Sequence, residues 1–324
     1  MIISRTPYRV SLFGGGTDYP DWYLRNNGAV ISFSINRYSY ITCRYLPQFF
    51  DFKYRIRYFK REEVNEISEI QHPSIRECIK MSSITHGLDI IHHGDLPAMS
   101  GLGTSSSFTV GMIHALEALK GAATKKQDLA IRAIEIEQKI LKENVGSQDQ
   151  VAAAFGGLNR INFHTDGKFS VNKLIISRER VKQIEGSICM FYTGIIRIAN
   201  TITGSQIENI RNGLDLSNVM DVVDEFEDLL GKSGNFVENF GKLLERQWEI
   251  KKNYADNISN NFIDKIYMKA KNNGAIGGKL LGAGSGGFIL FVTEDKKRLI
   301  NALNEVLHVP IEIDTEGSKI IHYE

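Results

Sequence analysis

The feature that most constrains this chain is a loop rich in glycine and hydroxyl side chains, residues 96–107, that runs directly into a helical pattern. Apolar residues recur at helical spacing from Thr104 to Leu119, which predicts a helix over that stretch. The first N–H groups of a helix have no intrahelical partners and lie at the positive end of the helix dipole. Because glycines let the backbone approach an anion closely, we expect an anion-binding site here.

The hydroxyl groups of Thr104, Ser105 and Ser106 would add hydrogen-bond donors, or a magnesium ligand, to this loop. The loop is not a Walker A sequence, because the lysine of GxxxxGK[ST] is absent. Phosphate charge would therefore be neutralised by backbone N–H groups, by Mg²⁺ or by residues elsewhere. The alternative is a capped helix after a flexible turn, although a cap needs only a single hydroxyl.

A second glycine cluster, residues 281–288, contains the pattern GxGxxG at Gly282, Gly284 and Gly287. A dinucleotide fingerprint follows a strand and opens a helix. Here an apolar run beginning at Phe288 predicts a strand instead, so we reject a Rossmann site. A glycine loop of this kind either presents backbone N–H groups to a substrate or forms a tight turn or bulge.

The third cluster is a predicted strand that ends in three glycines, residues 14–16, followed by a polar Thr-Asp-Tyr. Consecutive glycines can form a nest of N–H groups that suits anions. Taken alone, Arg9 in the strand is better explained as a solvated or paired charge, and Asp18 equally well as a turn residue.

One carboxylate is expected to be buried. Residues 128–143 have a helical pattern in which the neighbours of Glu137 one turn away are Ala133, Ile134, Ile140 and Leu141. An unpaired buried carboxylate is costly, so Glu137 should have a cation, a metal or a hydrogen-bond partner. Twelve residues further on, Asp149 stands at the start of a small-residue run, where an acid in a first helical turn also has a structural explanation.

Strands are expected first and helices later, with two domains divided near residue 184. The 324 residues include 39 Lys+Arg and 38 Asp+Glu, a balance that excludes nucleic-acid binding driven by overall charge. No apolar run has the length of a membrane span, and the N-terminus lacks the layout of a secretory signal, so we expect a cytoplasmic protein. The three cysteines are expected to be ordinary reduced thiols.

These three motifs, at residues 5–19, 96–107 and 277–291, in this order resemble the GHMP kinases. The resemblance implies an α+β, two-domain fold: a ribosomal protein S5 domain 2-like N-terminal domain, residues 1–184, with the ATP-phosphate loop, and a ferredoxin-like C-terminal domain, residues 185–324. It also implies an ATP- and Mg²⁺-dependent sugar 1-kinase. The triple glycine departs from the Gly-Glu-His of galactokinases and is similar to the branch that phosphorylates D-glycero-D-manno-heptose 7-phosphate, feeding nucleotide-activated heptose for surface polysaccharide.

The resemblance also assigns roles. Asp149 matches the catalytic aspartate, and Arg9 the basic residue that pairs with it and stabilises the transferring phosphoryl group. Ser105 and Glu137 would hold Mg²⁺. The expected ATP-phosphate cradle is Gly101, Gly103, Thr104, Ser105 and Ser106. The expected acceptor side is Gly14, Gly15, Gly16, Thr17, Asp18 and Tyr19, with the loop Gly284, Ser285 and Gly286.

Replacing Glu-His by Gly-Gly leaves space and free N–H groups, which suits an acceptor with an extra phosphorylated carbon. Arg197 is a candidate second phosphate contact, although a surface arginine is the simpler interpretation. The expected partner is a small sugar phosphate, not nucleic acid or membrane, and the oligomeric state is left open. Two alternatives remain: a 1-kinase for an unphosphorylated sugar such as fucose or galactose, and a GHMP-fold protein that binds without catalysing transfer.

Overall fold

The computed structural model describes residues 1–195 and 199–324. Its first sheet is built on two long antiparallel strands, β1 (Ile2–Phe13) and β2 (Gly28–Tyr45). Its strand order is β13-β1-β2-β5-β3-β4, with β6 and β12 also paired to β2, and β7 paired to β6. The other strands are β3 (Tyr54–Arg57), β4 (Arg61–Val64), β5 (Leu88–Gly94), β6 (Leu158–Phe163), β7 (Phe169–Lys173), β12 (Ile313–Asp314) and β13 (Lys319–Tyr323).

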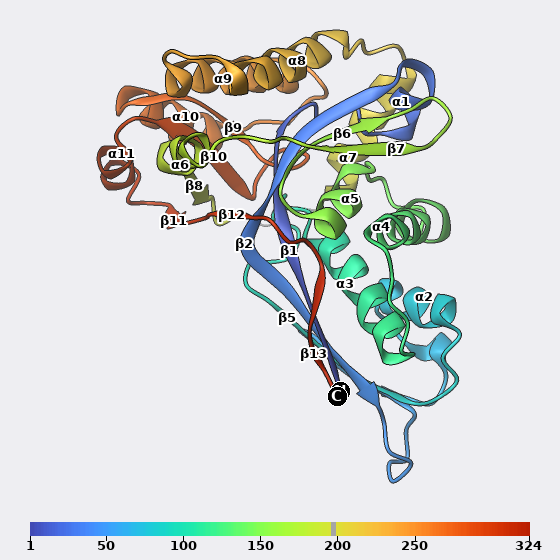
Figure 1. Cartoon of the computed structure of the whole chain (residues 1–324). Helices are drawn as coiled ribbons and strands as arrows, with labels where there is room; N and C mark the ends of the chain where they lie inside the picture. The colour runs from blue at the N-terminus through green and yellow to red at the C-terminus, as the bar shows by residue number, and fades with distance from the viewer. Residues whose placement is uncertain (196–198) are drawn as a thin grey trace.

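Helices cover one face of this sheet (Figure 1). They are α2 (Pro73–Ser82), α3 (Thr104–Leu119), α4 (Lys126–Ile134) and α5 (Gln148–Phe155), and a short α1 (Pro20–Asn26) follows β1. The predicted helix from Thr104 to Leu119 is confirmed as α3, which is largely buried and packs on β1 and β2. The helix expected over 128–143 differs: α4 begins at Lys126 and passes into a π-helical segment, η2 (Glu135–Ile140), which ends the helix early.

A second sheet has the antiparallel order β11-β8-β10-β9. Its strands are β8 (Ile188–Tyr192), β9 (Ala275–Leu280), β10 (Phe288–Thr293) and β11 (Leu307–Val309). Its helices are α6 (Arg178–Ser187), α7 (Ala199–Arg211), α8 (Ser217–Gly231), α9 (Phe236–Lys252), α10 (Asn261–Asn272) and α11 (Lys296–Ala302). As expected, the glycine cluster at 281–288 enters a strand, β10, and not a helix.

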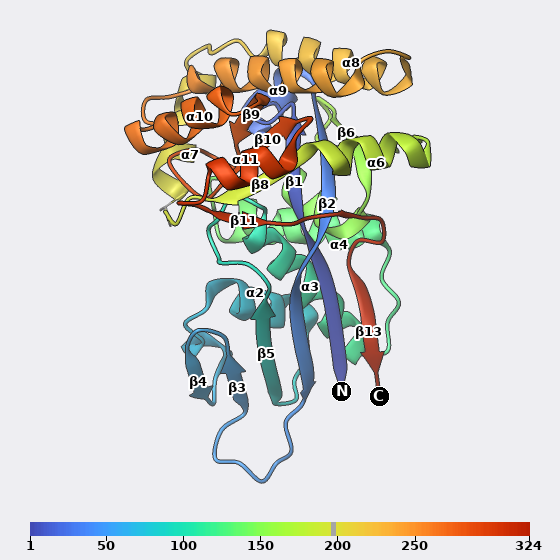
Figure 2. The same ribbon diagram turned by 90° about the vertical axis from the view of Figure 1, so that its left-hand side faces the viewer.

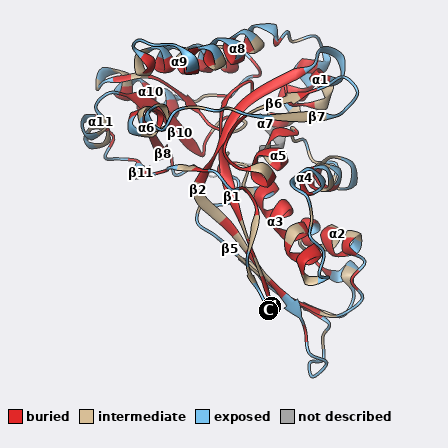
Figure 3. Cartoon of the chain, in the orientation of Figure 1, coloured by how far each residue is buried: buried red, intermediate tan, exposed pale blue. Residues whose placement is uncertain are grey.

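Aromatic side chains pack the end of β1 against helices α8 and α9. Phe13 at the end of β1 lies 4.6 Å from Phe226 of α8 and 6.3 Å from Phe240 of α9, between ring centroids. Figure 3 shows the buried residues following β1, β2 and α3 through the centre of the molecule. Burial of such side chains is worth about 1.5–3 kcal/mol each, so this layer fixes the end of β1 against α8 and α9.

The last two strands of the chain return to the first sheet. After β11, the strands β12 and β13 return to the first sheet, where β12 pairs with β2 and β13 with β1, and the two termini lie side by side (Figure 2). The expected boundary at residue 184 falls within α6, just before β8 opens the second sheet. A division there stays a prediction. Within the described residues, no helix combines the length and hydropathy required to cross a membrane.

Candidate active site

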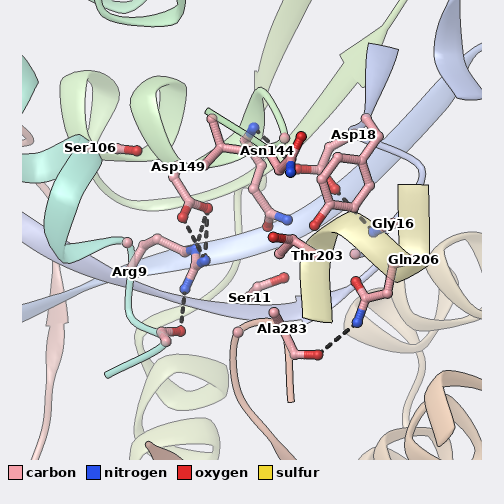
Figure 4. Close-up of a pocket in the computed structure, with 18 of the residues that line it drawn as sticks. Arg9, Ser11, Gly16, Asp18, Ser106, Asn144, Asp149, Thr203, Gln206 and Ala283 are labelled. Atoms are coloured by element: carbon pink, nitrogen blue, oxygen red, sulfur yellow. Dashed lines mark hydrogen bonds and ion pairs between the residues drawn. The ribbon is translucent and has the colours of Figure 1, made fainter. Parts of the chain in front are cut away.

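A cavity of about 350 Å³ opens where the three glycine clusters meet (Figure 4). It lies at the junction of the end of β1, the loop into α3, the start of α5, helices α7 and α9, and the loop between β9 and β10. Of the residues expected from the sequence, those that line it are Arg9, Gly15, Gly16, Asp18, Tyr19, Gly101, Gly103, Thr104, Ser105, Ser106 and Asp149.

At one end of the cavity is the loop that starts α3. Gly101 and Gly103 have φ values of +85° and +69°, a left-handed conformation that glycine adopts without strain. A side chain at Gly103 would come within 3.2 Å of an Asp149 carboxylate oxygen and 3.3 Å of Arg9. The backbone therefore approaches this charged pair closely, and the first turn of α3 presents its N–H groups beside it.

Arg9 and Asp149, which both line the cavity, form a bidentate ion pair. Arg9 Nε donates to Asp149 Oδ1 and Nη2 to Oδ2, each at 2.8 Å, and Nη1 donates to the carbonyl oxygen of Gly101 at 2.9 Å. The Arg9 side chain is 5% exposed and that of Asp149 is 25% exposed. The local sequence allowed either a solvated or a paired charge at Arg9. In the structure Arg9 is a paired and buried cation, held between the loop at Gly101 and a carboxylate that faces the cavity.

Glu137 is fully buried, as its position on the apolar stripe predicted. Its Oε2 accepts a hydrogen bond from Ser106 Oγ at 2.8 Å and another from Gln150, whereas Oε1 has no hydrogen-bond partner among the described residues. Burial raises the pKa of Glu137 to about 7. An orphaned carboxylate oxygen behind a cavity hydroxyl fits a magnesium ion, which prefers hard oxygen ligands and keeps several waters.

Glu137 is contacted by the serine that follows the predicted magnesium ligand, and the predicted magnesium pair stays a prediction. Ser106 donates to the carboxylate, while Ser105, the predicted partner in a magnesium site, is exposed at the cavity. Helix geometry explains this, since successive residues of α3 point about 100° apart and only one can face η2. Among the described residues, no cluster of three or more His, Cys, Asp or Glu side chains could hold a metal by itself.

At the other end of the cavity lies the segment after β1. Gly15, Gly16, Asp18 and Tyr19 line the cavity, but Gly14 and Thr17 do not. Thr17 is fully buried and its hydroxyl donates to the carbonyl oxygens of Gly14 and Ala29, so it holds the turn together.

Asp18 is almost fully buried, and its carboxylate accepts a hydrogen bond from the Gly16 N–H at 3.0 Å. Burial, followed by the charge of Asp149, raises the pKa of Asp18. Both acids border one cavity, yet Asp149 is neutralised by Arg9 while Asp18 is stabilised by backbone N–H groups. The two carboxylates are therefore suited to different tasks.

The third glycine loop reaches the cavity with Gly282 and Ala283, not with the expected Gly284, Ser285 and Gly286. The Ser285 hydroxyl donates to the Asn257 carbonyl oxygen, and the backbone N–H of Ser285 donates to the Ile258 carbonyl oxygen at 2.8 Å. Added side chains at Gly284 and Gly286 would meet Ile258 and Ile195 at 3.0 Å or closer. These three residues pack the loop against its neighbours. Arg197 lies outside the described residues.

Tertiary packing also brings residues to the cavity that the sequence analysis did not single out. Tyr254 donates a hydrogen bond to the carbonyl of Gly15 at 3.0 Å, and Gln206 of α7 donates to that of Ala283. Lys279 of β9 is buried and lines the cavity. A signal for Lys279 existed, since it is the sole charged residue in the apolar and glycine run 274–293.

An anion loop at a helix start, a cation bound to a carboxylate, and a second carboxylate beyond them are the parts that phosphoryl transfer needs. The chain matches the models of the GHMP kinases N-terminal domain over residues 70–157 and of the GHMP kinases C-terminal domain over residues 226–309. It belongs to the GHMP kinases. The expected family, its two-domain fold and phosphotransferase activity are confirmed, and this family uses ATP as its phosphate donor.

Among individual relatives, D-glycero-alpha-D-manno-heptose 7-phosphate kinase of Campylobacter jejuni is 30% identical over 94% of this chain and 93% of its own. A crystal structure of a D-glycero-D-manno-heptose 1-phosphate kinase from Bacteroides thetaiotaomicron matches with a TM-score of 0.77, 25% identity and full coverage of both chains. Galactokinase of Pyrococcus furiosus is 26% identical over 92% of this chain and 91% of its own. The chain is thus a sugar kinase of this family.

Proposed function

We propose that this protein transfers the γ-phosphoryl group of ATP to the anomeric C1 hydroxyl of D-glycero-D-manno-heptose 7-phosphate, giving the 1,7-bisphosphate. That product would supply nucleotide-activated heptose for surface polysaccharide. The observation that supports the chemistry is the Arg9–Asp149 ion pair, which lies beside the loop that opens α3. The 7-phosphate acceptor rests on the name of the Campylobacter jejuni relative and on the glycine-lined space at Gly15 and Gly16. The Bacteroides thetaiotaomicron structure, named for a heptose 1-phosphate kinase, supports heptose as the sugar.

In this proposal the phosphates of ATP lie on the α3 loop and the sugar lies toward Asp18. Asp149 accepts the proton of the C1 hydroxyl while the oxygen attacks the γ-phosphorus, and the bond from that phosphorus to the β–γ bridging oxygen breaks to release ADP. Arg9 occupies one lone pair on each Asp149 oxygen, and each oxygen retains another. The Arg9 guanidinium stabilises charge on the transferring group.

Glu137, together with Ser105 or Ser106, would hold Mg²⁺ at the phosphate end. When bound, the ion neutralises charge on the β- and γ-phosphates. Glu137 must ionise to bind it, and burial opposes ionisation. Ser106 and Gln150 both donate to Oε2 of Glu137, so they fix one carboxylate oxygen and leave Oε1 without a protein partner among the described residues.

The test is ATP-to-ADP turnover, with product analysis, on free fucose, galactose and heptose beside D-glycero-D-manno-heptose 7-phosphate. We expect turnover with the phosphorylated heptose alone. Turnover with a free hexose instead would keep the kinase chemistry and discard this acceptor. Silence across the panel, with folded protein that binds nucleotide, would favour a binding protein without catalytic activity.

A further inference from the structure

The cavity contains a buried lysine that the mechanism above leaves unused. Lys279 lies on β9, is 3% exposed and borders the same cavity as Arg9 and Ser11. Its ammonium donates to the carbonyl oxygen of Leu12 at 2.7 Å and to that of Ser11 at 3.1 Å. Figure 4 shows Ser11 facing the cavity near Arg9, so these hydrogen bonds place the ammonium at the end of β1, close to the proposed reaction centre.

No carboxylate among the described residues is paired with Lys279, and the charge that acts on it most is that of Arg9. The charged side chains that share its cavity are Arg9 of β1, Asp18 after β1, Glu143 and Asp149 near α5, and Lys251 of α9. Asp149 is engaged by Arg9, and no ion pair to Lys279 is present among the described residues. An ammonium has three N–H donors, of which backbone carbonyls take two. A buried cation bound only by carbonyl groups is costly until an anion joins it.

We propose that Lys279 is a second phosphate-binding cation of this active site, which donates its third N–H to a phosphate dianion. This inference rests on the proposed function. The dianion is either the transferring phosphoryl group or the phosphate already on the acceptor, because both would enter this cavity. Lys279 thereby complements Arg9, which uses three of its five N–H groups on Asp149 and Gly101.

In this proposal, binding of the dianion is coupled to protonation of Lys279. Burial, together with the nearby charge of Arg9, lowers the pKa of Lys279 to about 7. Above pH 7 the free protein therefore holds Lys279 mostly neutral, and a bound dianion favours its charged form. The proton comes from solvent and stays on Nζ until the anion leaves, so no bond to phosphorus is made by Lys279.

The first experiment is calorimetric titration of the full chain with inorganic phosphate at pH 8, in two buffers of different ionisation enthalpy and without magnesium. We expect uptake of a large fraction of a proton in the wild type. Lys279→Met keeps the length of the side chain without charge, and should take up none and bind phosphate at least ten-fold more weakly. Wild-type binding without proton uptake, or equal behaviour of the two proteins, overturns the proposal. This readout does not depend on which sugar is the acceptor.

The second experiment identifies the phosphate and guards against a folding defect. kcat and KM of the wild type, Lys279→Met and Lys279→Arg are compared with phosphorylated and unphosphorylated heptose, with thermal unfolding as the check of folding. A role on the acceptor phosphate raises KM for the phosphorylated heptose alone, while a role on the transferring group lowers kcat with every acceptor used. Lys279→Arg should restore part of the loss in either case. Unchanged kinetics in folded Lys279→Met contradict the proposal.

Discussion

At the end of the cavity where we propose that ATP binds, called the donor end here, the phosphate-binding groups come from one continuous loop, residues 101–106, and from the helix that it opens. The acceptor end is assembled differently: Tyr254 hydrogen-bonds to Gly15 from 239 positions away, and Gln206 of α7 holds the loop at Ala283. The donor end follows local rules of helix starts and glycine conformation. The proposed acceptor end depends on how α7 packs on α1 and how α9 packs on β1. We therefore expect substitutions there to change acceptor specificity and leave the phosphate chemistry intact.

The largest expected effect is at the junction of the two ends. Arg9→Ala removes the guanidinium that pairs with Asp149 and stabilises the phosphoryl group, so kcat should fall by roughly 10³-fold or more. The KM for ATP should change little, because the loop backbone remains. Steady-state kinetics with both substrates varied will measure this. A defect confined to the KM for ATP would show that Arg9 only binds nucleotide.

Asp149→Asn retains the shape of the side chain but cannot accept the hydroxyl proton. We expect kcat to fall by about 10²–10⁴-fold, the range for general base catalysis, with nucleotide binding preserved. Rates measured under single turnover isolate the chemical step. Near-full turnover would leave Asp149 with an orienting role and remove base catalysis from the mechanism.

The protonation of the buried Glu137, at the proposed donor end, can be measured through the pH dependence of protein stability. Its pKa is about 7 in the folded state and about 4.3 in an unfolded chain, so the folded state holds the proton longer. The free energy of unfolding therefore decreases by about 4 kcal/mol in total as pH rises from about 4.3 to about 7, and this loss remains above pH 7. Urea unfolding of the metal-free wild type and of Glu137→Gln at pH 5 and pH 8 isolates this contribution, because the other titrating groups, His92, His114 and Lys279 among them, act equally in both proteins. Between these pH values the wild type should lose roughly 2–3 kcal/mol relative to Glu137→Gln.

Magnesium supplies the matched control for that variant. Adding the ion at pH 8 should stabilise the wild type but not Glu137→Gln, because an amide is a much weaker ligand than a carboxylate. Equal pH dependence in the two metal-free proteins would mean that Glu137 is already ionised without a metal. Equal stabilisation by Mg²⁺ would place the ion elsewhere.

The smallest effect belongs to the acceptor end. A methyl group at Gly15 would meet Ser11 and Gln148 at 3.5 and 3.8 Å, which is ordinary contact, so Gly15→Ala should fold. It occupies part of the acceptor space and should raise the acceptor KM several-fold while the KM for ATP is unchanged. Gly14→Ala is the matched control that should disrupt folding, because its methyl group would lie 2.0 Å from the Ala29 carbonyl oxygen. An equal rise in both KM values for Gly15→Ala would remove the distinction between the two ends.

The sequence predicted those parts whose signals are local. The start of α3 and the burial of Glu137 follow from periodicity, and the strand after Gly287 rules out a dinucleotide site. The sequence did not predict which serine side chain points toward Glu137, which is Ser106 and not Ser105. Residues brought in by docking, such as Tyr254 and Lys279, lack a local pattern that gives their partners. The return of β12 and β13 to the first sheet is likewise set by long-range pairing.

The central claim, transfer to C1 of a heptose that already has a phosphate, is tested most directly by ³¹P NMR of the product. The protein is incubated with ATP, Mg²⁺ and D-glycero-D-manno-heptose 7-phosphate, and the products are compared with those from the unphosphorylated sugar. We predict a second sugar phosphate signal coupled to the anomeric proton, formed only from the phosphorylated heptose. A phosphate at any other carbon, or equal reaction of the unphosphorylated sugar, would contradict the account.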